Sequence, residues 1–231
     1  MTATQAETMD RETVAVLGAG GTMGFPIARD IARAGIPVRA WNRSRDKAEP
    51  LTKDGAYLAD SAADAARGAG IVITMLADED AVIATMDGPQ GALSGMTQTN
   101  AGRNRANDPG HPIWVQMSTI GEAATKRCAE LANRSGVGFV DAPVLGTRQP
   151  ADERKLVVLE SGPEEARPRV QPVFDAIGHR TIRVGEAGAG SRLKLVINSW
   201  VVAVVAAGAE TIALAEGLGL DPYLTSTPRR A

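Results

Sequence analysis

A short apolar run that leads into a glycine-rich loop restricts the fold of this chain more than any other feature. Residues 13–17 are apolar enough for a buried strand, and residues 18–24 read GAGGTMG. Residues 22–34 then place apolar side chains at helical spacing, and Gly35 ends that pattern. A strand, a glycine loop and a helix in this order begin a βαβ unit whose loop and helix start can hold the pyrophosphate of a dinucleotide.

The glycines of this loop are spaced one residue wider than the usual G-x-G-x-x-G, because position 23 is methionine and the last glycine is at 24. We therefore expect one extra residue in the loop, with either Gly18 or Ala19 at the first position. The alternative is a plain glycine-rich turn without a ligand. The candidate cofactor contacts in the loop are Gly18, Ala19, Gly20, Gly21, Thr22, Met23 and Gly24.

Strands and helices alternate along most of the chain. Further apolar strands are predicted at 37–41, 71–76, 113–117, 138–140, 156–159 and 181–184, and helices at 62–68, 80–86 and 122–135. The polar stretch 97–112 is expected to be a surface loop. This alternation predicts an α/β fold, with an N-terminal Rossmann dinucleotide-binding domain built on a mainly parallel sheet.

The pattern changes near the C-terminus to one long helix that begins at 191 and reaches about 218. We divide the chain into a disordered tail at 1–11, a Rossmann domain at 12–187 and a helical segment at 188–231, with residues 185–190 as the hinge. Residues 195–209 are nearly all apolar, but this run is shorter than the roughly 20 residues that a membrane span needs. A buried helix is therefore expected there.

Composition excludes several classes of function. The 231 residues carry a net charge of −2 with scattered Lys and Arg, so neither nucleic acid nor an anionic membrane is an expected partner. A single cysteine rules out an internal disulfide framework, and no clustered ligand pattern suggests a metal. The polar N-terminus lacks the features of a signal peptide, which predicts a cytoplasmic protein.

The end of the second predicted strand bears on the choice of cofactor. NAD-selective sites usually place Asp or Glu there to bind the ribose 2′-hydroxyl, whereas this chain has Asn42, Arg43 and Ser44. Arg43 can pair with a 2′-phosphate and Ser44 can hydrogen-bond to it. NADP(H) is therefore favoured over NAD(H), the alternative being that Arg43 is only an exposed loop cation.

Five motifs in order are similar to those of the β-hydroxyacid dehydrogenase family, which contains 3-hydroxyisobutyrate dehydrogenase and the glyoxylate/succinic semialdehyde reductases. They are GAGGTMG, WNRS at 41–44, QMSTI at 116–120, DAPVLGT at 141–147 and GAGSRLKLVIN at 188–198. The resemblance covers roughly 13–221 and implies NAD(P)-linked interconversion of a small hydroxy acid and its semialdehyde or keto form. It also implies cofactor contacts from Thr119 and from Met75, Leu76 and Ala77.

In this family the lysine of G-x-G-x-x-x-K is catalytic, and an asparagine one turn later supports it. These positions fall on Lys194 and Asn198. Residues four apart share one helix face, and a lysine on an apolar helix has its pKa lowered by desolvation. Lys194 can then donate a proton in reduction and accept it in oxidation.

The DAPVLGT segment departs from the DAPVSGG that the family commonly has for the substrate carboxylate. Leu145 cannot replace the serine hydroxyl, but Thr147 can supply part of that contact. The expected substrate-binding residues are Ser118, Gly146 and Thr147, and Ser118 is also a candidate helix cap.

Family members continue past the long helix into more helices, and residues 221–231 show no helical pattern. The helical domain is therefore expected to be truncated, and its apolar helix to favour a homodimer. Two alternatives to an active dehydrogenase stay open. One is a nucleotide-binding remnant with little catalysis, and the other is a relative of the imine reductases, although these usually lack a lysine at this position.

Overall fold

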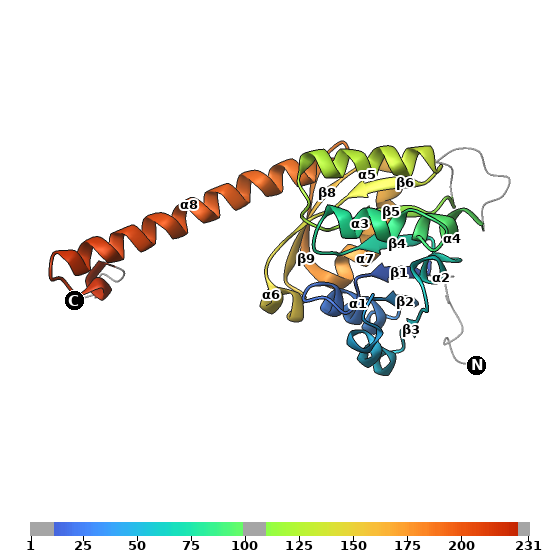
Figure 1. The fold of residues 1–231 in the computed structure, drawn as a ribbon, viewed down its shortest axis with the longest axis horizontal. Helices are drawn as coiled ribbons and strands as arrows, with labels where there is room; N and C mark the ends of the chain where they lie inside the picture. The colour runs from blue at the N-terminus through green and yellow to red at the C-terminus, as the bar shows by residue number, and fades with distance from the viewer. Residues whose placement is uncertain (1–11, 99–109, 226–231) are drawn as a thin grey trace, which may run out of the picture.

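A computed structural model describes residues 12–98 and 110–225, which form a doubly wound α/β sheet domain with a long helix projecting from it (Figure 1). The tail at 1–11 and most of the polar loop at 97–112 lie outside the described residues, so the predictions made for them are not tested.

The sheet confirms the predicted fold class. Its strand order is β3-β2-β1-β4-β5-β6-β8-β7, and β9 also pairs with β8. The first six strands run parallel, and β8 runs antiparallel to β6 and β7 but parallel to β9. The order reverses between β1 and β4, and ligands of such sheets bind at this switch point, outside the carboxyl ends of the strands. The strands are β1 Val14–Leu17, β2 Val38–Trp41, β3 Tyr57–Leu58, β4 Ile71–Thr74, β5 Ile113–Gln116, β6 Gly138–Asp141, β7 Val144–Leu145, β8 Leu156–Ser161 and β9 Gly178–Gly185.

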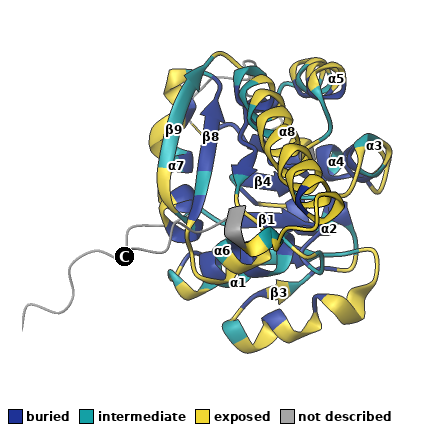
Figure 2. Ribbon diagram, turned by 90° about the vertical axis from the view of Figure 1, so that its left-hand side faces the viewer, coloured by how far each residue is buried: buried dark blue, intermediate teal, exposed yellow. Residues whose placement is uncertain are grey.

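Helices cover both faces of this sheet, and so its central strands are buried (Figure 2). One face holds α1 Gly24–Arg33, α6 Arg148–Asp152 and α7 Arg167–Ile177. The other holds α2 Ala62–Ala66, α3 Glu79–Met86, α4 Ala92–Gln98 and α5 Glu122–Arg134. Along β1, Val14 and Val16 pack into the first layer, whereas Ala15 and Leu17 pack into the second, as the two-residue period of a strand requires.

Several elements escaped the sequence analysis. They are the two-residue strands β3 and β7, helices α4, α6 and α7, and the 3₁₀ helices η1 Arg45–Lys47, η2 Glu49–Asp54, η3 Glu164–Ala166 and η4 Pro222–Thr225. Helix α7 contains Pro172 and has another proline, Pro168, in its first turn. Proline is strongly unfavourable inside a helix, so a pattern search passes over such a segment even where tertiary packing stabilises it.

Helix α8, Ala189–Gly217, differs from the prediction of a buried helix. Trp200 is 67% exposed and Val202 is 68% exposed, and within α8 only Gly190, Ser191 and Ala215 are buried. The expectation is wrong within the described chain because the sheet domain meets only the first turns of α8, and no other described element covers the middle. By length and composition alone α8 could also cross a membrane, so the absence of a membrane partner stays a prediction.

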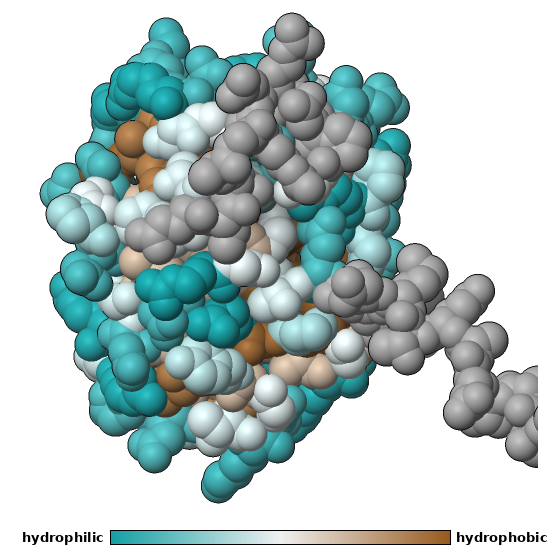
Figure 3. Space-filling view, turned by 90° about the vertical axis from the view of Figure 1, so that its right-hand side faces the viewer, coloured by the Kyte–Doolittle hydropathy of each residue, from teal (hydrophilic) through white to brown (hydrophobic). Residues whose placement is uncertain are grey.

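Exposed apolar residues are therefore concentrated on one part of the molecule. Apart from Tyr57, the large hydrophobic residues that are exposed among those described all lie between Leu195 and Tyr223. The opposite end of the sheet domain is hydrophilic over most of its described surface (Figure 3). The sheet domain thus buries its own core, whereas α8 does not.

Candidate active site

The glycine loop turns sharply at its first glycine. Gly18 has φ +89°, and its N–H donates to the Trp41 carbonyl oxygen at 2.9 Å. A Cβ on Gly18 would overlap the Met75 carbonyl oxygen, and a Cβ on Gly24 would overlap the Gly18 carbonyl oxygen. Gly18 rather than Ala19 therefore takes the first position. The extra residue of the loop is accommodated before Gly24, which allows α1 to start directly against the turn.

The start of α1 suits an anionic ligand. Its N-cap residue is Met23, which makes no side-chain capping hydrogen bond, and α1 has no acidic residue in its first turn. The N–H groups at this end of the helix carry the positive end of the helix dipole, so they favour a phosphate. Gly20, Gly21 and Thr22 are partly or fully exposed beside them. These residues fit the pyrophosphate of a dinucleotide.

Two arginines that follow β2, Arg43 and Arg45, differ in their surroundings. Arg45 pairs with Asp60 at 2.8 Å, whereas Arg43 is exposed and forms no ion pair with any described residue. The Asn42 side chain donates to the Ser44 carbonyl oxygen at 2.8 Å, which shapes the turn around Arg43. Arg43 is thus available to a ligand bound along this edge.

A pocket of about 550 Å³ lies beside the end of β2, and neither the glycine loop nor Lys194 lines it. It is therefore separate from the residues where chemistry is expected. Its lining consists of Trp41, Asp60, Ser61, Ala62, Ala84, Thr85, Asp87, Gly88, Pro89, Gln90 and Gly91.

The ends of β4 and β5 are locked together by Ser118. Its buried hydroxyl accepts a hydrogen bond from the Leu76 N–H at 2.8 Å, and Gln116 Nε2 donates to its carbonyl oxygen at 2.7 Å. This geometry favours a positioning role for Ser118 over the predicted contact with substrate. The next residue, Thr119, is exposed, as is Ala77 at the end of β4, so both remain available to a cofactor.

Lys194 reaches the carboxyl edge of the sheet from the first turns of α8. Its Nζ donates to the Val144 carbonyl oxygen at 2.7 Å, and partial burial lowers the pKa of the ammonium group. Val144 is followed at once by the segment predicted to bind substrate. Asn198 lies one turn further along α8 and is partly buried.

That segment, which begins just after Val144, presents polar groups that are not engaged by capping hydrogen bonds. Gly146 has φ +127°, a backbone conformation that residues with a side chain rarely adopt, so glycine is favoured there. Thr147 is exposed and is the N-cap of α6, yet its side chain makes no capping hydrogen bond. Leu145 is partly buried. The Thr147 hydroxyl and the backbone around Gly146 are therefore available to a small ligand.

Two further residues, Asp141 and Ser191, were not singled out by the sequence analysis. Asp141 is fully buried and hydrogen-bonds to the N–H and the hydroxyl of Ser191, both at 2.7 Å. Asp141 lies in the motif DAPVLGT and Ser191 in GAGSRLK. The sequence signal that could have identified Asp141 is an acidic residue directly after an apolar strand.

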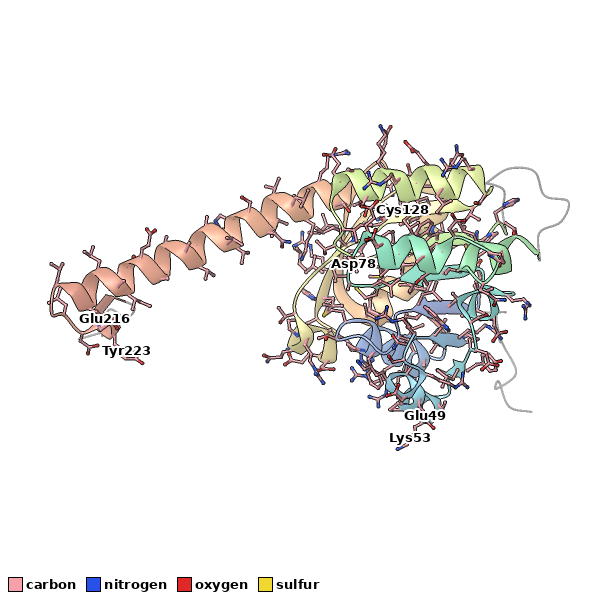
Figure 4. The ribbon with its side chains drawn as sticks, viewed as in Figure 1. Glu49, Lys53, Asp78, Cys128, Glu216 and Tyr223 are labelled. Atoms are coloured by element: carbon pink, nitrogen blue, oxygen red, sulfur yellow. The ribbon has the colours of Figure 1, made fainter. Side chains whose placement is uncertain are left out.

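The predicted residues thus form one row along the carboxyl ends of the parallel strands. The order is the segment 42–44 after β2, the glycine loop after β1, 75–77 after β4, 118–119 after β5 and 141–147 after β6. Asp78, the N-cap of α3, lies on the side of the domain from which α8 leaves (Figure 4). A glycine loop at the switch point of the sheet and a desolvated lysine at the same edge define a dinucleotide-binding protein of the Rossmann class.

Comparison with known proteins specifies the class further. The NAD-binding domain of 6-phosphogluconate dehydrogenase matches residues 13–185. The chain is 34% identical over 209 residues to the uncharacterized oxidoreductase YfjR of Bacillus subtilis, and 30% identical over 202 residues to the chloroplastic glyoxylate/succinic semialdehyde reductase 2 of Arabidopsis thaliana. These matches cover 90% and 87% of this chain.

A solved structure of 3-hydroxyisobutyrate dehydrogenase from Mycobacterium tuberculosis, with L-serine, has a TM-score of 0.77 at 28% identity and covers 96% of this chain. This chain spans 68% of the Bacillus protein, 53% of the Arabidopsis protein and 72% of the Mycobacterium chain. The chain belongs to the family defined by the NAD-binding domain of 6-phosphogluconate dehydrogenase. The predicted resemblance to the β-hydroxyacid dehydrogenases is confirmed, since the chain is also 32% identical over 213 residues to the 3-hydroxyisobutyrate dehydrogenase of Pseudomonas aeruginosa.

Proposed function

We propose that this protein is an NADP(H)-dependent oxidoreductase that interconverts a small β-hydroxyacid, similar to 3-hydroxyisobutyrate, and its semialdehyde. The observation that carries the proposal is the placement of Lys194. Its ammonium group is partly desolvated and lies at the same sheet edge as the glycine loop, and its one hydrogen bond to a described residue goes to a neutral carbonyl oxygen. Hydroxyacids and semialdehydes are the compounds for which the relatives are named.

The chemistry of this chain's own residues follows from that placement. NADPH, when bound, supplies the hydride. Lys194 moves its hydrogen bond from the Val144 carbonyl oxygen to the carbonyl oxygen of the substrate and donates a proton there as charge develops. In the oxidation direction, the neutral amine accepts the hydroxyl proton. Asn198, four residues on along the same helix face, orients the lysine or the substrate oxygen.

The substrate carboxylate is assigned to the segment after β7. The Thr147 hydroxyl and the N–H groups around Gly146 are the donors nearest in sequence to the Val144 carbonyl that holds Lys194. Leu145 offers no side-chain donor, so the carboxylate would rest on fewer hydrogen bonds than a serine at this position provides. A short-chain substrate can place its carbonyl oxygen at Lys194 and its carboxylate at this segment.

The choice of NADP(H) is assigned to Arg43. Arg43 lies two residues after β2 and forms no ion pair with any described residue. A 2′-phosphate can accept two parallel hydrogen bonds from a guanidinium group. No acidic residue occupies positions 42–44 to bind a ribose 2′-hydroxyl.

The apolar surface of α8 is assigned to a second copy of this chain. A helix that is apolar all round is normally buried, and α8 is apolar and exposed over 200–205. The net charge of −2 gives no reason to expect a nucleic-acid partner. We therefore assign the protein a small-molecule substrate and, from the exposed helix, a homodimeric state, and we place it in the cytoplasm.

A fluorescence titration with NADPH, followed by turnover assays with methylmalonate semialdehyde, glyoxylate, succinic semialdehyde and a cyclic imine, tests the proposal. Micromolar NADPH binding is expected, together with oxidation of NADPH by methylmalonate semialdehyde, the product of 3-hydroxyisobutyrate oxidation. NADPH binding without turnover on any compound would indicate a nucleotide-binding remnant, and turnover on the imine alone would indicate an imine reductase. The absence of NADPH binding would contradict the proposal altogether.

A further inference from the structure

One short segment of the sheet edge holds α8 at two points. Asp141, at the end of β6, hydrogen-bonds to Ser191 in the first turn of α8. Val144, three residues later, accepts the hydrogen bond from Lys194, three residues after Ser191. Three residues are just under one turn of an α-helix, so Ser191 and Lys194 lie on the same side of α8.

The first point is a buried carboxylate that caps the helix. The N-cap of α8 is Gly188, which has no side chain to satisfy the first N–H groups of the helix. Asp141 Oδ2 accepts from the Ser191 N–H at 2.7 Å, and Asp141 Oδ1 accepts from the Ser191 hydroxyl at 2.7 Å. The capping role is thus filled by a side chain from β6, placed at the positive end of the dipole of a 29-residue helix.

A second acceptor completes the cap. Ser161 Oγ, at the end of β8, accepts from the Gly190 N–H at 2.9 Å and donates to the Asp141 carbonyl oxygen at 3.0 Å. A Cβ on Gly190 would overlap the Leu159 carbonyl oxygen, so the helix start is seated directly on β8. These contacts leave α8 little freedom to rotate or slide at its first turn.

The burial of Asp141 is costly unless its hydrogen bonds are kept. The side chain is 0% exposed, and burial raises the pKa of its carboxyl group, an effect that the bonds from Ser191 and Ser161 and the nearby Arg192 oppose. An apolar residue would fill the same space without that cost. A buried acid at this place thus argues for a requirement of geometry.

We propose that Asp141 is the positioning residue of Lys194. By fixing the rotation of α8 at Ser191, it sets the direction in which a side chain one turn later leaves the helix, and so directs the Lys194 ammonium to the Val144 carbonyl. The inference rests on the catalytic role proposed for Lys194, but the position of Lys194 can be measured without activity.

The alternative is that Asp141 only stabilises the fold, and the pKa of Lys194 separates the two. Loss of a neighbouring negative charge alone lowers the pKa of a lysine, whereas release of Lys194 into water raises it toward the ordinary value of 10.5. The sign of the change therefore reports position rather than charge.

The experiment labels the protein with [¹³Cε]lysine and follows each Cε resonance with pH. The chain has five lysines, at 47, 53, 126, 155 and 194, and the signal missing from Lys194→Arg identifies Lys194. In Asp141→Ala the pKa of Lys194 should rise by roughly half a unit or more, and in Ser191→Ala it should rise by less. The matched control is Glu160→Gln. Glu160 is a buried acid on β8, 1% exposed, and its ion-pair partners, Arg183 on β9 and Arg167 on α7, lie outside α8.

An unchanged or lowered pKa of Lys194 in folded Asp141→Ala would overturn the proposal. If Asp141→Ala does not fold, Ser191→Ala decides, because it keeps the Ser191 N–H bond, and no rise there would overturn the proposal equally. An equal rise in Glu160→Gln would attribute the effect to general loosening and would also overturn it. A shifted pKa with no turnover in the wild type would instead count against the proposed function and leave the positioning role standing.

Discussion

The Nζ atom of Lys194 lies 2.7 Å from the carbonyl oxygen of Val144, and this bond joins α8 to the sheet edge next to the segment that would bind substrate. The partner is a neutral carbonyl, and no carboxylate in the described part of the chain pairs with the ammonium group to offset its burial. Desolvation therefore dominates and lowers the pKa of Lys194. A lysine held in this way releases its proton at a lower pH than a lysine in water.

The pH dependence of catalysis should follow this lysine. Reduction of an aldehyde needs the ammonium form, so kcat/KM should fall as pH rises through a pKa below 10.5. Oxidation of the hydroxyacid needs the amine, so its kcat/KM should rise across the same interval. Steady-state rates in both directions between pH 6 and 10.5 test this.

The control for that profile is Lys194→Arg, whose guanidinium group keeps its charge over the whole range. Whatever activity this variant retains in reduction should not show the alkaline fall. A fall at the same pH in the arginine variant would assign the titration to another group.

Arg43→Ala should weaken NADPH binding about 10- to 100-fold and NADH binding hardly at all. A charge-assisted hydrogen bond to a phosphate contributes about 1.5–3 kcal/mol, and only NADPH carries the 2′-phosphate. Fluorescence titration with both cofactors gives the ratio. The matched variant is Arg45→Ala in the same turn, whose charge is engaged by Asp60 and which should affect both cofactors alike. Equal losses for NADPH and NADH in Arg43→Ala would refute the selector role.

Gly18→Ala should be far more damaging than Gly55→Ala, although both glycines have a similar positive φ of +89° and +86°. The left-handed conformation costs an alanine about 1–2 kcal/mol at either site. At Gly55 nothing lies within 4 Å of the added Cβ, whereas at Gly18 it would overlap the Met75 carbonyl oxygen.

Urea denaturation and NADPH titration of both glycine variants measure this difference. A free energy of unfolding lowered by roughly 3 kcal/mol or more, or lost NADPH binding, is expected for Gly18→Ala alone. Similar stabilities of the two variants would show that the glycine loop is not packed against β4 as described.

Charged substitutions in the middle of α8 should prevent self-association. Val201→Glu with Val205→Glu introduces two charges into the exposed apolar surface of the helix, and a desolvated unpaired charge opposes any apolar interface. Light scattering after gel filtration should give a dimer for the wild type and a monomer for the double variant. Lys53→Glu, on the exposed 3₁₀ helix η2 far from α8, is the control and should leave the mass unchanged (Figure 4). A monomeric wild type in detergent-free buffer would contradict the assignment of α8 to a second copy.

The features that sequence patterns predicted correctly are those with a strong local physical signature. The apolar strands and the glycine loop identified the Rossmann fold because burial on both sheet faces and a positive φ each leave few choices of residue. The parallel strands bring segments 42–44, 75–77 and 118–119 to one edge of the sheet. Segment 42–44 was predicted from its place after a strand, whereas the cofactor contacts from 75–77 and Thr119 were predicted from the family resemblance.

The features that the sequence could not settle depend on long-range contacts. Whether Gly18 or Ala19 leads the loop is decided by the Met75 carbonyl oxygen, more than fifty residues away. The hydroxyl of Ser118 suits a ligand on chemical grounds, but the Leu76 N–H engages it. The pairing of Asp141 with Ser191 spans fifty residues and follows no spacing rule. The exposure of α8 likewise depends on the elements that do or do not cover it.

The central claim is that Lys194 transfers the proton in catalysis and is not needed to bind the cofactor. The most direct measurement compares wild type and Lys194→Met at saturating NADPH, with the aldehyde that the wild type reduces fastest, and determines the NADPH Kd of both by fluorescence. A kcat lower by about 10²- to 10⁴-fold with an NADPH Kd unchanged within about threefold is predicted. A kcat retained within tenfold in a folded, NADPH-binding Lys194→Met would contradict the account.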